Sequence, residues 1–137
     1  MVERKFMLDT NILIAMFKGE NGIQERLVHE GFGKCVVSDI SLGELYVGAF
    51  KTGNLHMFKQ IEFVRNNFTI INASTSYESY GKLRALLETV GRRVDDMDLF
   101  IASSAIDNNC LLVTDNGKHF NRIPNLDIRN WFEEHRR

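Results

Sequence analysis

The sequence predicts an α/β fold, a three-layer α/β/α sandwich around a mostly parallel central sheet. Short apolar runs of extended character alternate with longer stretches of helical period. This alternation is typical of a parallel sheet whose two faces are covered by helices. The chain has no repeat and no low-complexity stretch, and its single proline is Pro124. We therefore expect residues 1–137 to form a single domain.

The expected strands are short. Four apolar runs fit them, at Phe6–Leu8, Val36–Val37, Phe68–Ile71 and Leu111–Val113, and a final short strand is expected near Ile128. Most of these runs are apolar without alternation, as expected for strands that are buried on both faces.

Helical periodicity covers the segments between the strands. The expected helices are Thr10–Lys18, Asn21–Glu30, Ser38–Phe50, Asn54–Asn66, Thr75–Val90 and Asp96–Asp107. Ser38 and Asp39 are the cap candidates of the third helix. The last helix carries the small apolar sequence LFIASSAI, which lets a neighbour approach closely. Beyond the final strand, Trp131 and Phe132 are expected to pack the tail against the core.

Charge and composition exclude some classes of function. The chain has 17 Lys and Arg against 18 Asp and Glu, a formal charge of −1. This excludes an overall basic surface that would attract nucleic acid nonspecifically, so any nucleic-acid contact must be local and metal-assisted. No apolar run approaches the roughly 20 residues of a membrane helix. Glu3, Arg4 and Lys5 precede only a brief apolar stretch without a cleavage pattern, so we expect a cytoplasmic protein.

The metal-binding side chains do not have the spacing of a zinc site. Cys35 and Cys110 lie in apolar contexts and are expected to be buried thiols. The four histidines lack cysteine companions and i, i+4 spacing, so we expect them to be surface or structural residues.

Carboxylates follow the apolar runs at several places where ligands bind in open α/β sheets, beyond the carboxyl ends of the strands. Asp9 ends the first strand, and Asp115 follows the fourth. Glu44 and Asp98 lie on the helices that begin after the second strand and at Asp96.

Each of these carboxylates has a simpler alternative explanation. Asp9 could only cap a helix. Glu44 lies three residues after Ser41, the spacing of a capping box. The acidic run of Asp95, Asp96 and Asp98 would be favoured by the positive end of a helix dipole. Asn116 and Gly117 could be an ordinary turn.

Taken together, the four acids favour a metal site. Two carboxylates about 4 Å apart repel by roughly 4 kcal/mol at an effective dielectric near 20, so a shared pocket needs a compensating cation. Oxygen ligands select a hard ion, Mg²⁺ or Mn²⁺. Such an ion activates water and neutralises charge on a leaving oxygen, which makes phosphodiester hydrolysis the natural chemistry.

Four motifs carry a family resemblance. In chain order they are LDTNILI, SLGELYVGA, DLFIASSAI, and LLVTDNGKHFNRIPNL followed by Trp131. Together they resemble the successive motifs of PIN-domain ribonucleases, specifically VapC-type toxins of toxin–antitoxin pairs, from about Met7 to Trp131. The resemblance implies a single PIN-like nuclease domain and endonucleolytic cleavage of RNA that depends on Mg²⁺ or Mn²⁺. It also implies a cognate antitoxin that occludes the site.

The resemblance also implies roles for individual residues. Asp9, Glu44 and Asp98 match the first three acidic ligands. Asp115 is the preferred fourth, although Asn116 matches the form of the motif that has an asparagine there.

Other positions match or depart from the family's pattern. Asn11 and Thr114 resemble the polar residues that orient the ligands. Asp95 and Asp96 depart from the usual glycine and apolar residue, so they are either helix-start charges or part of a second metal site. The candidate RNA contacts, with solvated surface charge as the alternative, are Arg92, Arg93, Lys118 and Arg122.

Two other functions stay open at this point. Asp9 could be the nucleophile of a phosphatase or phospho-acceptor domain, although Asn11 stands where such enzymes carry a second Asp. The chain could also be a metal-binding interaction module without catalysis. The helices around Leu13–Phe17 and Leu55–Val64 could form a groove for an antitoxin peptide or the face of a homodimer.

Overall fold

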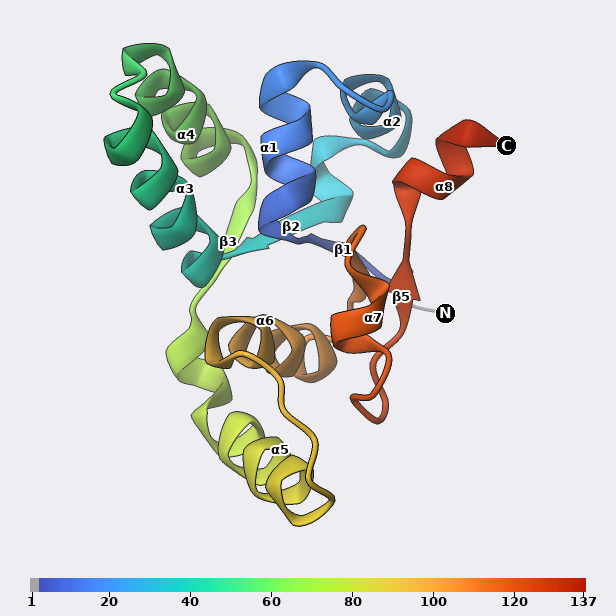
Figure 1. The fold of residues 1–137 in the computed structure, drawn as a ribbon. Helices are drawn as coiled ribbons and strands as arrows, with labels where there is room; N and C mark the ends of the chain where they lie inside the picture. Colours follow the sequence, from blue (N-terminus) through green and yellow to red (C-terminus); the bar gives the residue numbers. More distant parts are fainter. Residues whose placement is uncertain (1–2) are drawn as a thin grey trace.

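A parallel sheet forms the centre of the molecule in this computed structural model, which describes residues 3–137 (Figure 1). Its strands are β1 (Phe6–Leu8), β2 (Cys35–Ser38), β3 (Thr69–Ile71), β4 (Leu111–Val113) and β5 (Ile128–Arg129). They pair in the order β3-β2-β1-β4-β5, and every pairing is parallel. The predicted parallel sheet is confirmed.

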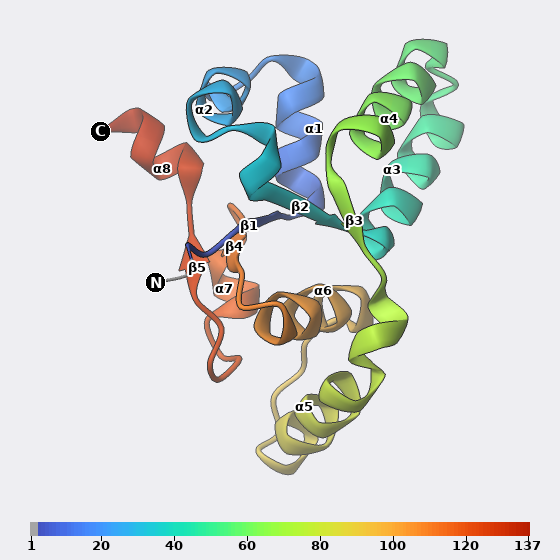
Figure 2. The same cartoon turned by 180° about the vertical axis from the view of Figure 1, so that it is seen from behind.

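Helices cover both faces of this sheet. They are α1 (Thr10–Lys18), α2 (Ile23–Glu30), α3 (Asp39–Thr52), α4 (Leu55–Asn67), α5 (Tyr77–Thr89), α6 (Asp96–Asp107), α7 (Gly117–Phe120) and α8 (Trp131–Arg136). Short 3₁₀ turns lie at Phe32–Lys34 and Ala73–Ser76. Figures 1 and 2 show α1 to α4 on one face and α5 and α6 on the other, which confirms the predicted sandwich.

In the described part of the chain, every helix is too short or too polar to cross a bilayer.

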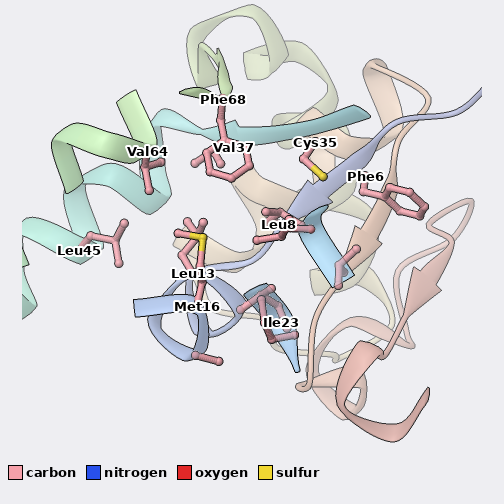
Figure 3. Close-up of a cluster of buried hydrophobic side chains, with 14 of the residues drawn as sticks. Phe6, Leu8, Leu13, Met16, Ile23, Cys35, Val37, Leu45, Val64 and Phe68 are labelled. Carbon is pink, nitrogen blue, oxygen red and sulfur yellow. The ribbon is translucent and has the colours of Figure 1, made fainter. Parts of the chain in front are cut away.

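Strand side chains alternate between two hydrophobic cores, as the pleat of a strand requires. Phe6 and Leu8 of β1 pack under α1 to α4, whereas Met7 between them packs with α5 and α6. Figure 3 shows Leu8 and Val37 in the first core, close to side chains of α1 and α4. The sheet is therefore packed against a hydrophobic core on each face.

The structure departs from the expected elements mainly at the C-terminal end. Neither α7 nor α8 was expected as a helix. Asn130 starts α8, because its side-chain oxygen accepts hydrogen bonds from the backbone N–H groups of Phe132 and Glu133. Trp131 is only 1% exposed, so the tail packs against the core as predicted. Cys35 and Cys110 are buried free thiols, also as predicted.

The strand order reverses next to β1, and the region beyond the carboxyl ends of β1 and β4 is called the crevice below. The chain moves outward from β1 to β2 and β3, and then returns to place β4 on the opposite side of β1. Helices that follow β1 and β4 therefore diverge to opposite faces. Ligands of open α/β sheets bind at such a point, beyond the carboxyl ends of the strands. Asp9 and Thr114 are the residues that directly follow β1 and β4.

Candidate functional site

Asp9 lies at this crevice with both carboxylate oxygens hydrogen-bonded. Oδ1 accepts from the backbone N–H of Thr10 at 2.8 Å, and Oδ2 accepts from the Thr114 hydroxyl at 2.8 Å. The Thr114 hydroxyl in turn accepts from the Asn116 backbone N–H at 3.0 Å, so its own proton is directed to Asp9. Asp9 does cap α1, as the simpler alternative supposed. An N-cap role requires one hydrogen bond to the helix and does not by itself explain why Asp9 is only 5% exposed.

Burial raises the pKa of Asp9 to about 6 from an ordinary 3.8. The hydrogen bonds from Thr114 and Thr10 lower the pKa, whereas the nearby charges of Asp98 and Glu44 raise it. The ionised carboxylate is therefore held by neutral donors while two other carboxylates repel it. A bound cation would relieve both the burial cost and this repulsion.

Glu44 approaches Asp9 from α3. Its Oε1 accepts a hydrogen bond from the Thr10 hydroxyl at 2.6 Å, and Thr10 Oγ1 also lies 3.0 Å from Ser41 Oγ. The capping-box alternative is therefore wrong, because Ser38 caps α3 through the Ile40 N–H and Glu44 lies further inside the helix. Sequence analysis overlooked Thr10 and Ser41, which share the crevice with the acids. A small polar residue one turn before Glu44 was the available signal for Ser41.

Asp98 projects from the first turn of α6, with its side chain 20% exposed. Burial and the charges of Asp95 and Glu44 raise its pKa, and His119 lowers it. His119 Nδ1 lies 3.7 Å from Asp98 Oδ2. The expectation that His119 is a surface residue is right about its exposure but missed this position beside the acids.

Asp96, two residues earlier, is engaged elsewhere. Its Oδ1 accepts hydrogen bonds from the Tyr80 hydroxyl at 2.7 Å and from Arg84 Nη2 at 2.5 Å. These contacts lower the Asp96 pKa. They tie the start of α6 to α5, and so they favour a helix-start charge over a ligand of a second metal.

The fourth acidic position, Asp115, is more exposed to solvent than the other three. Asp115 is exposed, and its Oδ1 accepts from Asn11 Nδ2 at 3.3 Å. The Asn116 side chain lies 3.0 Å from His119 Nδ1. Asn116 has φ −108°, so it does not form the positive-φ turn that an Asn-Gly pair often makes; instead it precedes α7. The Asn-x-x-His spacing places both side chains on one side of this short helix.

The four candidate RNA contacts lie in the chain segments next to Asp98 and Asp115. Arg92 and Arg93 line a hollow of about 680 Å³ between the end of α5 and the start of α6. Lys118 and Arg122 lie on and just after α7. All four are exposed, and within the described residues none of them forms a salt bridge.

The acids are neighbours without forming a closed cage. In the described part of the chain, no three His, Cys, Asp or Glu side chains surround a single ion position. Asp9, Glu44 and Asp98 nevertheless lie close enough for their charges to interact. This oxygen-only donor set fits a hard divalent cation that keeps several of its waters, rather than zinc.

The fold and this crevice define a class: an α/β protein whose carboxylates converge at the point where the strand order reverses. A family model described as the PIN domain matches residues 6–126. The chain belongs to the PIN domain family.

Relatives match over nearly their whole lengths. The Rickettsia felis protein named Ribonuclease VapC2 is 36% identical over 130 residues, which is 92% of this chain and 97% of that protein. The Shigella flexneri protein named tRNA(fMet)-specific endonuclease VapC is 31% identical over 132 residues, with coverages of 93% and 98%.

Solved structures of related proteins have a similar fold. The crystal structure of VapBC2 from Rickettsia felis, bound to a promoter DNA fragment, superposes with a TM-score of 0.82 at 34% identity, covering 92% of this chain and 98% of that one. DNA-bound VapBC from Salmonella typhimurium gives a TM-score of 0.79 at 30% identity, with coverages of 94% and 99%. The resemblance to VapC-type members of the PIN family is thus confirmed by sequence and by fold.

Proposed function

We propose that this protein hydrolyses RNA phosphodiester bonds with a divalent metal ion held by Asp9, Glu44 and Asp98, with Asp115 at the open side. The protein is a PIN-domain endoribonuclease of the VapC type, the toxin class of toxin–antitoxin pairs. One observation carries the site assignment. Asp9 is a buried carboxylate at the switch point of the sheet, with two further carboxylates beside it and only neutral hydrogen-bond donors on its oxygens.

The metal is Mg²⁺ or Mn²⁺ in this proposal, because the donors are oxygens. When bound, it would lower the pKa of a coordinated water and neutralise charge on the leaving oxygen. The chain's own residues prepare the site for it. Thr114 and the Thr10 N–H hold the Asp9 oxygens in place, and Asn11 orients Asp115. His119 Nδ1 lies 3.7 Å from Asp98 Oδ2.

RNA would be positioned by the basic side chains in the segments next to Asp98 and Asp115. Arg92 and Arg93 lie four and three residues before the start of α6, and Lys118 and Arg122 follow Asp115 by three and seven residues. Their guanidinium and ammonium groups are available for phosphate contacts that position the strand without reading its sequence.

The proposed partner is an antitoxin, as in the VapBC complexes of the relatives. The predicted groove between the first and fourth helices corresponds to an apolar hollow of about 310 Å³, where Phe17 of α1, Leu27 of α2 and Phe63 of α4 meet. An apolar antitoxin segment would fit this hollow. A homodimer and a cytoplasmic location belong to the same proposal, the latter because cellular RNA is the substrate.

The phospho-acceptor alternative fits this site less well. A phospho-acceptor domain of this kind carries a second Asp two residues after the nucleophile, whereas Asn11 stands at that position here. A metal-binding module without catalysis would retain the acids but leave RNA intact.

Cleavage by the purified protein tests the proposal. A mixed RNA substrate is incubated with wild type or with Asp98→Asn, in Mg²⁺, in Mn²⁺ or in EDTA. We expect cleavage by wild type with either ion, no cleavage in EDTA, and none by the variant, whose melting temperature stays close to that of wild type. Metal-independent cleavage, or undiminished cleavage by Asp98→Asn, would overturn the proposal. Retained metal binding with intact RNA would favour the binding module.

A further inference from the structure

Two hydroxyl groups lie between α1 and α3 next to the acids. Thr10 follows Asp9 directly and is 9% exposed, and Ser41 of α3 is completely buried. Thr10 Oγ1 lies 2.6 Å from Glu44 Oε1 and 3.0 Å from Ser41 Oγ. Ser41 lies three residues before Glu44, so both partners of Thr10 come from the same helix.

The direction of these hydrogen bonds follows from the chemistry of the groups. Thr10 has one hydroxyl proton, and an ionised carboxylate can only accept. The shorter contact therefore takes the Thr10 proton, and Ser41 donates its own proton to Thr10 Oγ1. In this chain of hydrogen bonds each donor polarises the next, so the bond to Glu44 is strengthened.

Thr10 consequently holds two carboxylates from two elements. Its backbone N–H binds Asp9 Oδ1 at the end of β1, and its hydroxyl binds Glu44 Oε1 on α3. Without the hydroxyl, Glu44 would have little to keep it in the crevice. Its side chain is only partly buried, and the negative charges of Asp9 and Asp98 repel it. Rotation toward solvent would then relieve the repulsion and restore rotamer freedom.

We propose that Thr10 is a positioning residue, supported by Ser41, that holds the Glu44 carboxylate beside Asp9 and leaves Glu44 Oε2 free for the metal ion or its water. This inference rests on the proposed function of the acids. Thr10 itself touches neither substrate nor metal, and it acts through Glu44.

Matched variants separate positioning from packing. Thr10→Val keeps the branched shape and removes the hydroxyl, Thr10→Ser keeps the hydroxyl, and Ser41→Ala removes only the supporting donor. We expect Thr10→Val to weaken Mn²⁺ binding and to lower kcat by about tenfold or more, the usual effect of removing a group that orients a metal ligand. The KM for RNA stays within twofold. Thr10→Ser restores both values to near wild type, and Ser41→Ala falls between.

A double variant and crystal structures test whether Thr10 acts through Glu44. In a Glu44→Gln background, Thr10→Val should cause no further loss of Mn²⁺ affinity; an equal loss in both backgrounds would overturn the proposal. Crystal structures of the metal-free proteins should show Glu44 beside residue 10 in wild type and Thr10→Ser, and turned to solvent in Thr10→Val. An unmoved Glu44 in Thr10→Val would likewise overturn it. If wild type neither binds Mn²⁺ nor cleaves RNA while Glu44 turns away, the proposed function fails and the positioning of Glu44 stands.

Discussion

The two sides of the crevice are built differently. On the buried side, Asp9 and Glu44 are held by hydroxyl and N–H donors at 2.6 to 2.8 Å. On the open side, the contact of Asp115 with Asn11 is 3.3 Å long, and that of Asp98 with His119 is 3.7 Å. On the buried side, the donors Thr10 and Thr114 lie within two residues of the ends of β1 and β4, whereas on the open side Asp98 and His119 lie on α6 and α7.

This difference indicates how an acidic site can be ready for a metal and still admit a polymer. Ligands fixed by neutral donors need little rearrangement when an ion binds. Loosely held ligands at the mouth can adjust as RNA enters. We therefore expect changes to the firmly held Asp9 to have larger effects than equivalent changes to Asp115 at the mouth.

The largest expected effect is on activity. Asp9→Asn should lower RNA cleavage by at least about a hundredfold, because metal-ion stabilisation of the transition state is worth several kcal/mol. The equivalent change on the open side, Asp115→Asn, should cost about tenfold or less. Single-turnover cleavage at saturating Mg²⁺ measures both. Equal losses in the two variants would remove the distinction between the two sides.

The raised pKa of Asp9 makes the stability of the metal-free protein depend on pH. Folded Asp9 binds its proton more tightly than unfolded Asp9, whose ordinary pKa is 3.8. The contribution of protonated Asp9 to the free energy of unfolding is fully present below about pH 3.8, and it is lost as the pH rises through about 6. A shift of this size corresponds to about 3 kcal/mol.

Urea unfolding of wild type and Asp9→Asn in EDTA, from pH 4 to 8, isolates this contribution. The difference in unfolding free energy should shift in favour of Asp9→Asn as the pH rises through about 6, and saturating Mg²⁺ should reverse that shift for wild type. A difference that does not change with pH would mean that Asp9 carries no burial cost.

Hydrogen bonds to the acids provide a third comparison. Thr114→Val removes the hydroxyl donor to Asp9 and should destabilise the protein at pH 7.5 by about 1.5–3 kcal/mol, the range for a bond to a charged group. Asn11→Ala removes the long, exposed contact to Asp115 and should cost less than about 0.5 kcal/mol. Urea unfolding of the two variants compares them directly. A larger loss in Asn11→Ala would reverse the assignment of the firmly held side.

The smallest expected effect concerns the candidate RNA contacts Arg92 and Arg93. Arg92→Ala and Arg93→Ala should each raise the KM for RNA a few-fold at low salt and leave kcat unchanged, with the difference shrinking as salt is added. Arg136→Ala, an exposed arginine on α8, is the matched control. Steady-state cleavage at two salt concentrations measures the effect. A KM that matches the control would mean that Arg92 and Arg93 are solvated surface charges.

Most of the fold was predictable from the sequence because local patterns determine it. The apolar runs of β1 and β4 and the periodicity of α1 and α6 placed these elements with their observed bounds. The helices α7 and α8 were missed for a physical reason. They have four and six residues, too few for a periodic pattern to be recognised in the sequence.

The acids of the site were predictable for a similar reason, whereas their partners were not. Asp9 and Asp115 end strands, and strand ends of a parallel sheet meet at one edge. Whether Thr10 donates to Glu44, or His119 lies beside Asp98, depends on how α1, α3 and α7 pack in three dimensions. No spacing in the sequence encodes those contacts. The single-domain organisation and the catalytic roles of the acids stay predictions.

Direct measurement of Mn²⁺ binding tests the central claim, that the carboxylates at the switch point hold a divalent ion. Electron paramagnetic resonance can count free Mn²⁺ at pH 7.5 as it is titrated into wild type, Asp9→Asn and the surface control Glu133→Gln. The account predicts saturable binding by wild type and by Glu133→Gln, and a loss of at least tenfold in affinity for Asp9→Asn. Equal binding by all three proteins, or none by wild type, would contradict it.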